Sequence, residues 1–249
     1  MGWRLFPEAV HLPVQLAVVL SDQARHPEAL DVLDEIEVDE RIPADLQVFL
    51  FGMRSNLLAA MGRWAEADEA LRDGLGFHPE SELLADAHEA LKHARRRARA
   101  EDALAASWRD ELTAIDGVGG EVDDAIVRCG AVNELPELVT LAARRLWRAF
   151  VEQEDPKLHA PDPWSAALVL AILEIDGDQR TTASIARSVR SNPSSVRTVL
   201  SRLRDFLSSL DDEIRMRAFA AHRNPRLDGV PPTPRFNERP ADVVPFPDR

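Results

Sequence analysis

Residues 48 to 81 read VFLFGMRSNLLAAMGRWAEADEALRDGLGFHPES. Their apolar side chains recur every three or four positions, which is the spacing of one face of an α-helix. Gly62 stands between the two periodic runs and can adopt the backbone conformations of tight turns at little cost, and Pro79 follows the second run. The stretch therefore predicts two amphipathic helices that form a hairpin. The apolar residues on helical spacing are Phe51, Leu58, Ala67, Leu71 and Leu75.

The same pattern precedes and follows this hairpin. Residues 16 to 36, LAVVLSDQARHPEALDVLDEI, align Ala29 with Ala67 and Leu33 with Leu71. A third copy begins at residue 81, where an apolar stripe runs along one predicted helix. That stripe consists of Leu83, Leu84, Ala87, Leu91 and Ala94. Repetition of a helical hairpin is typical of helical-repeat domains.

The repeated unit resembles a tetratricopeptide repeat, a unit of 34 residues in which small residues let two antiparallel helices approach closely. The positions that match are Gly62, Ala67, Leu71 and Pro79. Arg54 and Ser55 depart from the pattern, because the repeat usually has Leu and Gly there. Such repeats stack into concave surfaces, so the resemblance implies that this half binds a protein or peptide, or mediates dimerisation.

The composition predicts an all-α chain, because Ala, Leu, Glu and Arg favour helix and there are only 11 glycines in 249 residues. One cysteine, Cys129, can form neither an internal disulfide nor a thiolate metal cage, which favours a reducing cytoplasm. The apolar run from Pro13 covers eight residues and is too short to span a bilayer. We expect a cytoplasmic protein with no cofactor, no metal and no membrane contact.

The charge is unevenly distributed along the chain, whose formal net charge is -13. Residues 1 to 116 hold 23 Asp and Glu against 12 Lys and Arg, and residues 117 to 249 hold 20 against 18. Residues 179 to 204 nevertheless contain six arginines and no acid. Because an acidic chain attracts nucleic acid only weakly at long range, any such contact needs a local basic surface.

Within this basic segment, TTASIARSVRSNPSSVRTVLSRL (residues 181 to 203) predicts two short helices joined by residues 190 to 192. We expect Thr182 to cap the first helix, and Asn192 followed by Pro193 to begin the second. The residues expected to pack are Ile185, Ala186, Val189, Val196, Val199, Leu200 and Leu203.

This pattern resembles the DNA-binding helix-turn-helix. Ala186 matches the small residue of its first helix, Val196 and Val199 match the branched residues of its second, and Arg190 replaces a common turn glycine. The resemblance implies that the N-terminal residues of the second helix approach base edges while arginines engage phosphates. The candidate DNA-contacting residues are Arg180, Arg187, Arg190, Ser194, Ser195, Arg197, Thr198, Ser201, Arg202 and Arg204.

The wider stretch, residues 162 to 210, looks like the last helices of a cyclin-type box as found in transcription factor IIB-type proteins, and like an uncharacterised prokaryotic relative. This likeness implies nucleic-acid or protein recognition. Before the basic segment, residues 137 to 155 predict an amphipathic helix and residues 164 to 178 begin a nearly all-apolar helix, expected to be the core. The residues of the first helix expected to pack are Leu138, Leu141, Leu146, Trp147 and Phe150.

We therefore predict a helical-repeat domain over residues 10 to 113 and a helical domain ending in the helix-turn-helix over residues 137 to 212. A glycine-containing junction over residues 114 to 136 would join them. Residues 222 to 249 hold seven prolines and no periodic apolar face, which predicts a disordered tail.

Other motifs indicate surface or core. The basic run at residues 94 to 100 could touch phosphate, although a solvated face with helical ion pairs is favoured. His88 and His93 are five apart and cannot share a metal ion on one helix face, so we expect both to be surface residues. Cys129 is expected to be a buried, apolar-like residue. Three tryptophans are expected to anchor the core, namely Trp64, Trp147 and Trp164.

The sequence contains no acid/base pair or metal set of recognisable spacing, so we expect no enzyme. Our hypothesis is a non-enzymatic DNA-binding regulator of transcription, possible as a homodimer, with duplex DNA on the basic segment and a protein or peptide on the repeats. The alternative is a protein-interaction scaffold whose arginines bind an acidic partner. A third reading is an enzyme whose site is assembled from distant residues.

Overall fold

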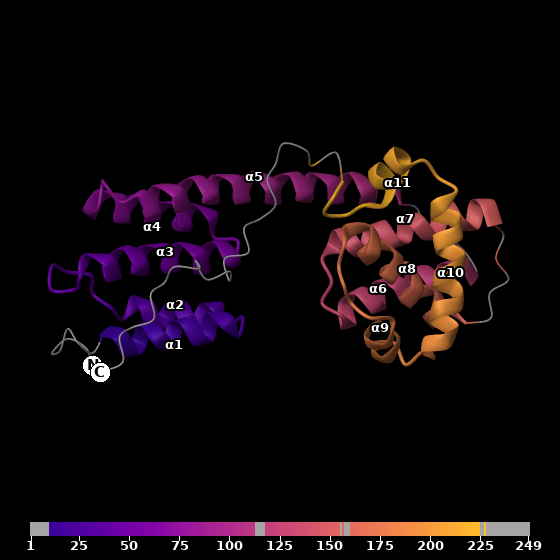
Figure 1. Ribbon diagram of the computed structural model, residues 1–249, viewed down its shortest axis with the longest axis horizontal. Helices are drawn as coiled ribbons and strands as arrows, with labels where there is room; N and C mark the ends of the chain where they lie inside the picture. The colour runs from indigo at the N-terminus through magenta and orange to yellow at the C-terminus, as the bar shows by residue number, and fades with distance from the viewer. Residues whose placement is uncertain (1–9, 113–117, 155, 157–159, 225–226, 228–249) are drawn as a thin grey trace. The chain divides into compact units, whose positions relative to one another are not determined.

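The computed structural model describes residues 10–112, 118–154, 156, 160–224 and 227 (Figure 1). These residues form helices and no strand, which confirms the all-α prediction. The helices are α1 (His11–Asp22), α2 (His26–Asp34), α3 (Ala44–Ala60), α4 (Trp64–Phe77), α5 (Glu82–Glu111), α6 (Val118–Val132), α7 (Glu137–Glu154), α8 (Pro161–Asp176), α9 (Thr182–Ser188), α10 (Pro193–Ser208) and α11 (Asp212–Phe219). The chain divides into an N-terminal and a C-terminal unit between Arg97 and Ala98.

The N-terminal unit contains two hairpins, α1–α2 and α3–α4, with the same turn. Ala24 and Gly62 occupy equivalent positions and both have left-handed backbones, with φ of 58° and 74°. The N–H group of the residue that follows each of them donates to the carbonyl five residues earlier, that of Leu20 at 2.9 Å and that of Leu58 at 2.8 Å. The turn predicted at Gly62 is confirmed, and Ala24 repeats it without a glycine.

Small residues bring the helices of these hairpins together. Ala29 in α2 and Ala67 in α4 are completely buried. At Gly74 in α4, an added Cβ would lie 2.8 Å from the Cβ of Phe51 in α3. Since real Cβ atoms do not approach so closely, α3 and α4 can cross at this distance only with glycine there.

The third copy is one long helix, as its single apolar stripe indicates. Residues 82 to 111 form one uninterrupted helix of 30 residues, α5. Leu84, Leu91 and Ala94 are buried as predicted, but the side chain of Leu83 is 61% exposed. Successive residues on a helix are rotated by about 100°, so the neighbours Leu83 and Leu84 cannot both face the core.

Helix α8 forms the centre of the C-terminal unit, as the apolar run predicts. All ten residues from Trp164 to Leu173 are buried, and α8 packs against α6, α7, α9 and α10. Helix α7 covers it with the residues expected from the sequence, all of them buried: Leu138, Leu141, Leu146, Trp147 and Phe150.

The segment predicted as a junction, residues 114 to 136, contains helix α6 instead. Val122, Ile126 and Cys129 of this helix are completely buried in the core of the C-terminal unit. Of the glycines that suggested a linker, Gly119 and Gly120 lie in the first turn of α6 and do not interrupt it, and Gly117 lies outside the described residues with the rest of the segment 114 to 117. The unit also begins earlier than residue 114, because Leu104 and Trp108 of α5 belong to the same core.

Most of the predicted tail, residues 222 to 249, lies outside the described residues. Its described beginning is packed. The Oδ1 atom of Asp176 accepts hydrogen bonds from the backbone N–H groups of Ala221, His222 and Arg223 at 3.1, 3.1 and 3.2 Å. Asn224 is 1% exposed. The irregular composition therefore does not prevent residues 222 to 224 from joining the C-terminal unit.

Candidate nucleic-acid interface on α9 and α10

Side-chain caps define where α9 and α10 begin. Thr181 has an extended backbone, and its Oγ1 accepts a hydrogen bond from the N–H of Ser184 at 3.2 Å. The predicted cap, Thr182, is instead the first helical residue, so the prediction is wrong by one position. The Oδ1 of Asn192 accepts from the N–H of Ser194 at 2.8 Å, and Pro193 begins α10 as predicted.

The turn between the two helices has a left-handed residue. Arg190 has a φ of 56°, and the N–H of Ser191 donates to the carbonyl of Ala186 at 2.8 Å. Glycine commonly supplies this conformation where a helix ends, because it lacks a Cβ. The replacement of glycine by Arg190 therefore changes the cost of the turn and not its geometry.

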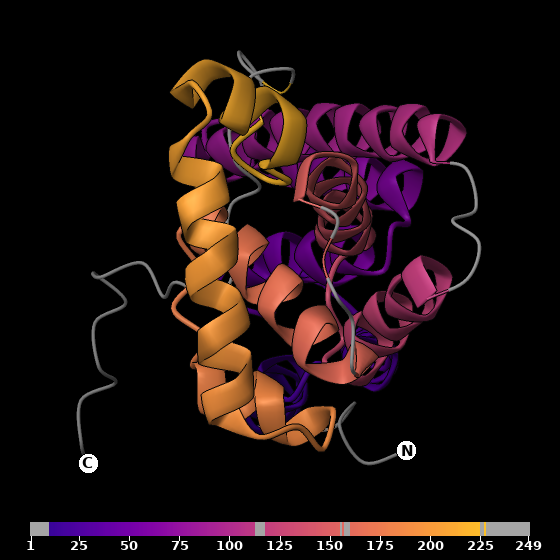
Figure 2. The same ribbon diagram turned by 90° about the vertical axis from the view of Figure 1, so that its right-hand side faces the viewer.

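The apolar sides of α9 and α10 face the core. In Figure 2, α10 runs along one side of the C-terminal unit, with α9 at its lower end and α11 at its upper end. Of the seven residues expected to pack, five are buried and two, Val189 and Val199, are partly buried against the core. The buried ones are Ile185, Ala186, Val196, Leu200 and Leu203.

All ten candidate DNA-contacting residues are exposed, but three of their arginines already bind within the chain. Arg204 donates from Nε to Glu174 at 3.0 Å, and this hydrogen bond raises the pKa of Arg204. Arg180 forms an ion pair with Asp178 at 3.7 Å. The guanidinium of Arg202 lies 5.3 Å from the centre of the Trp164 ring.

The other three arginines, Arg187, Arg190 and Arg197, are exposed and have no hydrogen-bond or ion-pair partner among the described residues. One precedes the α9–α10 turn, one lies in it and one follows it. We call these three residues, with Ser194, Ser195, Thr198 and Ser201 of α10, the α9–α10 surface. Planar guanidinium groups with free N–H donors bind phosphate and carboxylate oxygens.

The basic character of this surface ends partway along α10. At about 100° per residue, Ser194, Thr198, Ser201 and Asp205 fall on one side of the helix, and Asp205 is exposed. The hydroxyl of Thr198 is already used, since it donates to the carbonyl of Ser194 at 3.1 Å. The N-terminal half of α10 is therefore the part suited to a polyanion.

One positioning residue gave no signal in the sequence. The Nδ2 of Asn133, which follows α6, donates to the hydroxyl of Ser188 in α9 at 2.8 Å and to the carbonyl of Cys129 at 2.8 Å. The backbone carbonyl of Asn133 accepts a hydrogen bond from the guanidinium of Arg180 at 3.2 Å. Asn133 thus attaches α9 to the end of α6. These partners are far apart in the chain, so no local motif reveals the contact.

Three arginines of the basic run at residues 94 to 100 do not form the helical ion pairs that we expected. Arg95, Arg96 and Arg99 form no ion pair with another described residue. At spacings of three and four, their neighbours are mostly other bases, alanine and leucine. The nearby acid Glu101 instead pairs with His222 at 3.6 Å.

The histidine predicted to lie on the surface has a partner in the fold. The Nε2 of His88 in α5 lies 2.7 Å from the Oδ1 of Asp68 in α4. Arg72 pairs with the same carboxylate, and the two hydrogen bonds, that of Arg72 first, lower the pKa of Asp68. This cluster joins α4 to α5. Within the described part of the chain, no group of His, Cys, Asp and Glu is arranged to hold a metal ion.

Cys129 and the tryptophans lie where the sequence predicts. Cys129 is completely buried, and burial raises the pKa of its thiol to about 11. Trp147 and Trp164 are buried with their ring centres 5.4 Å apart and their planes tilted by 55°, and Trp64 packs partly buried in the N-terminal unit. These residues anchor cores.

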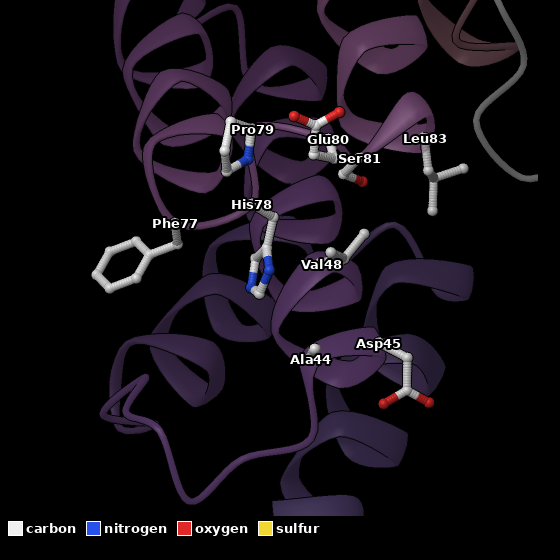
Figure 3. Close-up of a pocket in the computed structure, with 9 residues that line it drawn as sticks. All are labelled: Ala44, Asp45, Val48, Phe77, His78, Pro79, Glu80, Ser81 and Leu83. Atoms are coloured by element: carbon white, nitrogen blue, oxygen red, sulfur yellow. The ribbon is translucent and has the colours of Figure 1, made fainter.

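The N-terminal unit has a shallow hollow of about 490 Å³ between the start of α3 and the α4–α5 loop (Figure 3). Its lining includes Asp45, His78, Glu80 and Ser81. The Nε2 of His78 is bonded to the side chain of Gln47 at 2.8 Å, and Figure 3 shows the carboxylates of Asp45 and Glu80 directed apart. The hollow therefore does not bring its polar groups together.

Comparison with known proteins finds no family model, no curated protein and no solved structure that matches this chain. Among the described helices, none has both the length and the apolar character needed to cross a bilayer. Since no known protein matches, the candidate interface is described from the geometry of this chain alone.

Proposed function

We propose that this protein is a non-enzymatic, DNA-binding regulator of transcription, and that the α9–α10 surface acts as its helix-turn-helix. One observation carries the proposal: around a single turn, Arg187, Arg190 and Arg197 have no hydrogen-bond or ion-pair partner among the described residues. An anionic partner would supply the opposite charge that these guanidinium groups lack there.

The proposed binding mode uses α10 as the recognition helix. Exposed Ser194, Ser195 and Ser201 would approach base edges in the major groove, while the three arginines contact phosphates on either side. The first turn of α10 carries the positive end of the helix dipole and no acidic residue, which favours a phosphate nearby. Contacts with the end of α10 are disfavoured by Asp205.

The N-terminal unit would serve as the tetratricopeptide-like partner-binding or dimerising part. The matching turns at Ala24 and Gly62, together with completely buried Ala29 and Ala67, support a repeated unit. Such units bind peptides or other proteins on the surfaces formed by their stacked helices.

The test is equilibrium binding of the full chain to a labelled duplex of mixed sequence, measured by fluorescence anisotropy at low salt. The variant R187Q/R190Q/R197Q should lose at least about tenfold in affinity, because phosphate contacts supply most non-specific binding. The matched control is R25Q/R63Q/R72Q, which removes the same formal charge from three arginines that are paired with acids. This control should bind as the wild type does.

Failure of the wild type to bind duplex DNA at low salt would refute the proposal. The arginines would then be available for an acidic protein, as in the scaffold hypothesis. Equal losses in the two triple variants would also refute it, because net charge and not the α9–α10 surface would control binding.

A further inference from the structure

Helix α1 presents an apolar face that the unit leaves uncovered. The side chains of Leu12, Leu16 and Val19 are 62%, 50% and 50% exposed. Their spacing of four and three residues places them in one stripe along the helix. The opposite side of α1 is buried, and in Figure 1 the helix lies at the edge of the N-terminal unit beside α2. Exposed apolar stripes of this kind mark interaction sites.

The stripe is also free of charge. From Val10 to Ser21 there is no Asp, Glu, Lys or Arg, although residues 1 to 116 carry 23 acids and 12 bases. Two copies of so acidic a unit repel each other over most surfaces. An uncharged face is where they can meet without placing carboxylates together.

Among the residues of α1 itself, neither end carries a charged side chain that complements the helix dipole. Its N-cap, Val10, makes no side-chain hydrogen bond and the first turn has no acid, so nothing in the helix complements the positive end of its dipole. Its last residue, Asp22, lies at the negative end, where a carboxylate is unfavourable. An antiparallel second α1 would place Asp22 of one copy near the N-terminus of the other, and the reverse.

We propose that the protein forms a homodimer in which the α1 helices of two copies pack antiparallel about a twofold axis near Leu16. In this arrangement Leu16 of one copy faces Leu16 of the second copy, and Leu12 of one copy faces Val19 of the second. The same patch on both subunits is thus self-complementary, as a twofold interface requires. The spacing of the stripe and the charge at its ends together favour a second copy over an unrelated partner.

This dimer does not depend on the proposed DNA binding, because it is formed by the N-terminal unit and can be measured without DNA. If both are correct, the dimer presents two α9–α10 surfaces, and two half-sites are expected in the target.

The first test is sedimentation equilibrium of the full chain over a concentration series. The wild type should be a dimer, and Leu16→Glu should be a monomer, because it places two carboxylates against each other at the axis. Leu83→Glu is the matched control: Leu83 is 61% exposed in the same unit but lies outside the stripe, so this variant should remain dimeric. The circular dichroism spectrum must be unchanged in both variants, which shows that each one folds, whereas the melting temperature of Leu16→Glu should fall because dimerisation stabilises the folded chain.

The second test uses cysteines and does not require a disruptive substitution. Cys129 is completely buried, so it contributes little background with a short bismaleimide. Leu16→Cys should cross-link to itself. Leu12→Cys alone and Val19→Cys alone should not, but a mixture of these two variants should, because antiparallel packing brings residues 12 and 19 together.

Three results would overturn the proposal. The first is sedimentation of the wild type as a monomer throughout the series, which would leave the face to another protein. The second is a Leu16→Glu variant that remains dimeric. Cross-linking of Leu12→Cys to itself would show parallel packing and contradict the antiparallel arrangement.

Discussion

The guanidinium of Arg202 lies 5.3 Å from the centre of the Trp164 ring and 5.7 Å from that of Phe150. Both rings are buried, at 5% and 1% exposure, so the arginine covers an edge of the aromatic core. Arg197 stands five residues earlier on the same helix and has no partner among the described residues. Two arginines that look equivalent in the sequence therefore differ: Arg202 packs on the aromatic core, and Arg197 is available to bind a partner.

Replacing Arg202 should weaken the fold, whereas replacing Arg197 should not. We expect Arg202→Ala to lower the free energy of unfolding by about 1 kcal/mol, because it removes a cation–π contact and the apolar stem that covers the rings. Arg202→Met, which keeps an apolar stem, should recover part of the loss, and Arg197→Ala should leave stability unchanged. Urea denaturation measures all three, and equal losses at the two alanine variants would contradict this division.

Arg190→Gly should stabilise the protein. A side chain in the left-handed region costs roughly 1 to 2 kcal/mol, and the greater freedom of glycine in the unfolded chain offsets part of the gain. The expected increase in the free energy of unfolding is up to about 1 kcal/mol. Gly62→Ala is the reverse experiment at an equivalent conformation, with φ of 74°, and should be destabilising. A stability loss in Arg190→Gly would show that its side chain supports the turn.

Two glycines of α4 give a matched pair. Gly74→Ala should destabilise by about 1 to 3 kcal/mol, because its Cβ would lie 2.8 Å from Phe51. Gly76→Ala has nothing within 4 Å and should stabilise by about 0.5 to 1 kcal/mol, since alanine is the better helix former. Thermal unfolding of both variants checks the α3–α4 crossing. The same effect at both sites would mean that the helices are not so close.

Asp176 should make stability depend on pH. Burial raises the pKa of this carboxyl, against the opposing effect of the backbone N–H groups that bind it. The folded chain then holds the proton more tightly than the unfolded chain. The resulting stabilisation is fully present below the ordinary pKa and is lost as the pH rises through the raised pKa.

The measurement is the free energy of unfolding of wild type and Asp176→Asn between about pH 3 and pH 7. The wild-type value minus the variant value should fall as the pH rises. Asp68→Asn is the control of opposite sign: hydrogen bonds from Arg72 and His88 lower the pKa of Asp68, so its contribution should be present above the ordinary pKa and lost as the pH falls. Parallel curves for the two variants would contradict these assignments.

Periodicity was sufficient to predict α3, α4, α7 and α8 and much of the two cores, but not α6 or α11. The apolar residues of α7 and α8 fall where the pattern predicts because a buried helix face needs little information beyond spacing. The glycine at position 62 predicted a turn, but Ala24 adopts the same turn and nothing in its residue type predicts it. Glycines near residue 118 suggested a linker, although the first turn of a helix accommodates them and the rest of α6 is strongly apolar on one side.

The candidate interface was predictable as a set of residues but not as a set of roles. For the candidate residues in α9 and α10, exposure follows from the helical pattern, whereas Arg180 precedes α9 and Arg190 lies in the turn. Which arginines are engaged depends on Glu174 and Trp164 in α8 and on Asn133 after α6. Glu174 is 30 residues from Arg204 along the chain, and Asn133 is 47 residues from Arg180. Local spacing cannot report such contacts, so only the fold separates Arg187, Arg190 and Arg197 from the others.

The most direct measurement of the central claim is the salt dependence of duplex DNA binding for wild type and for R187Q/R190Q/R197Q. The logarithm of the binding constant should fall linearly with the logarithm of the salt concentration. The triple variant should reduce the slope by up to about 0.9 for each phosphate contact removed. A slope unchanged from wild type, in a variant that still folds, would contradict the assignment of the α9–α10 surface as the DNA-binding face.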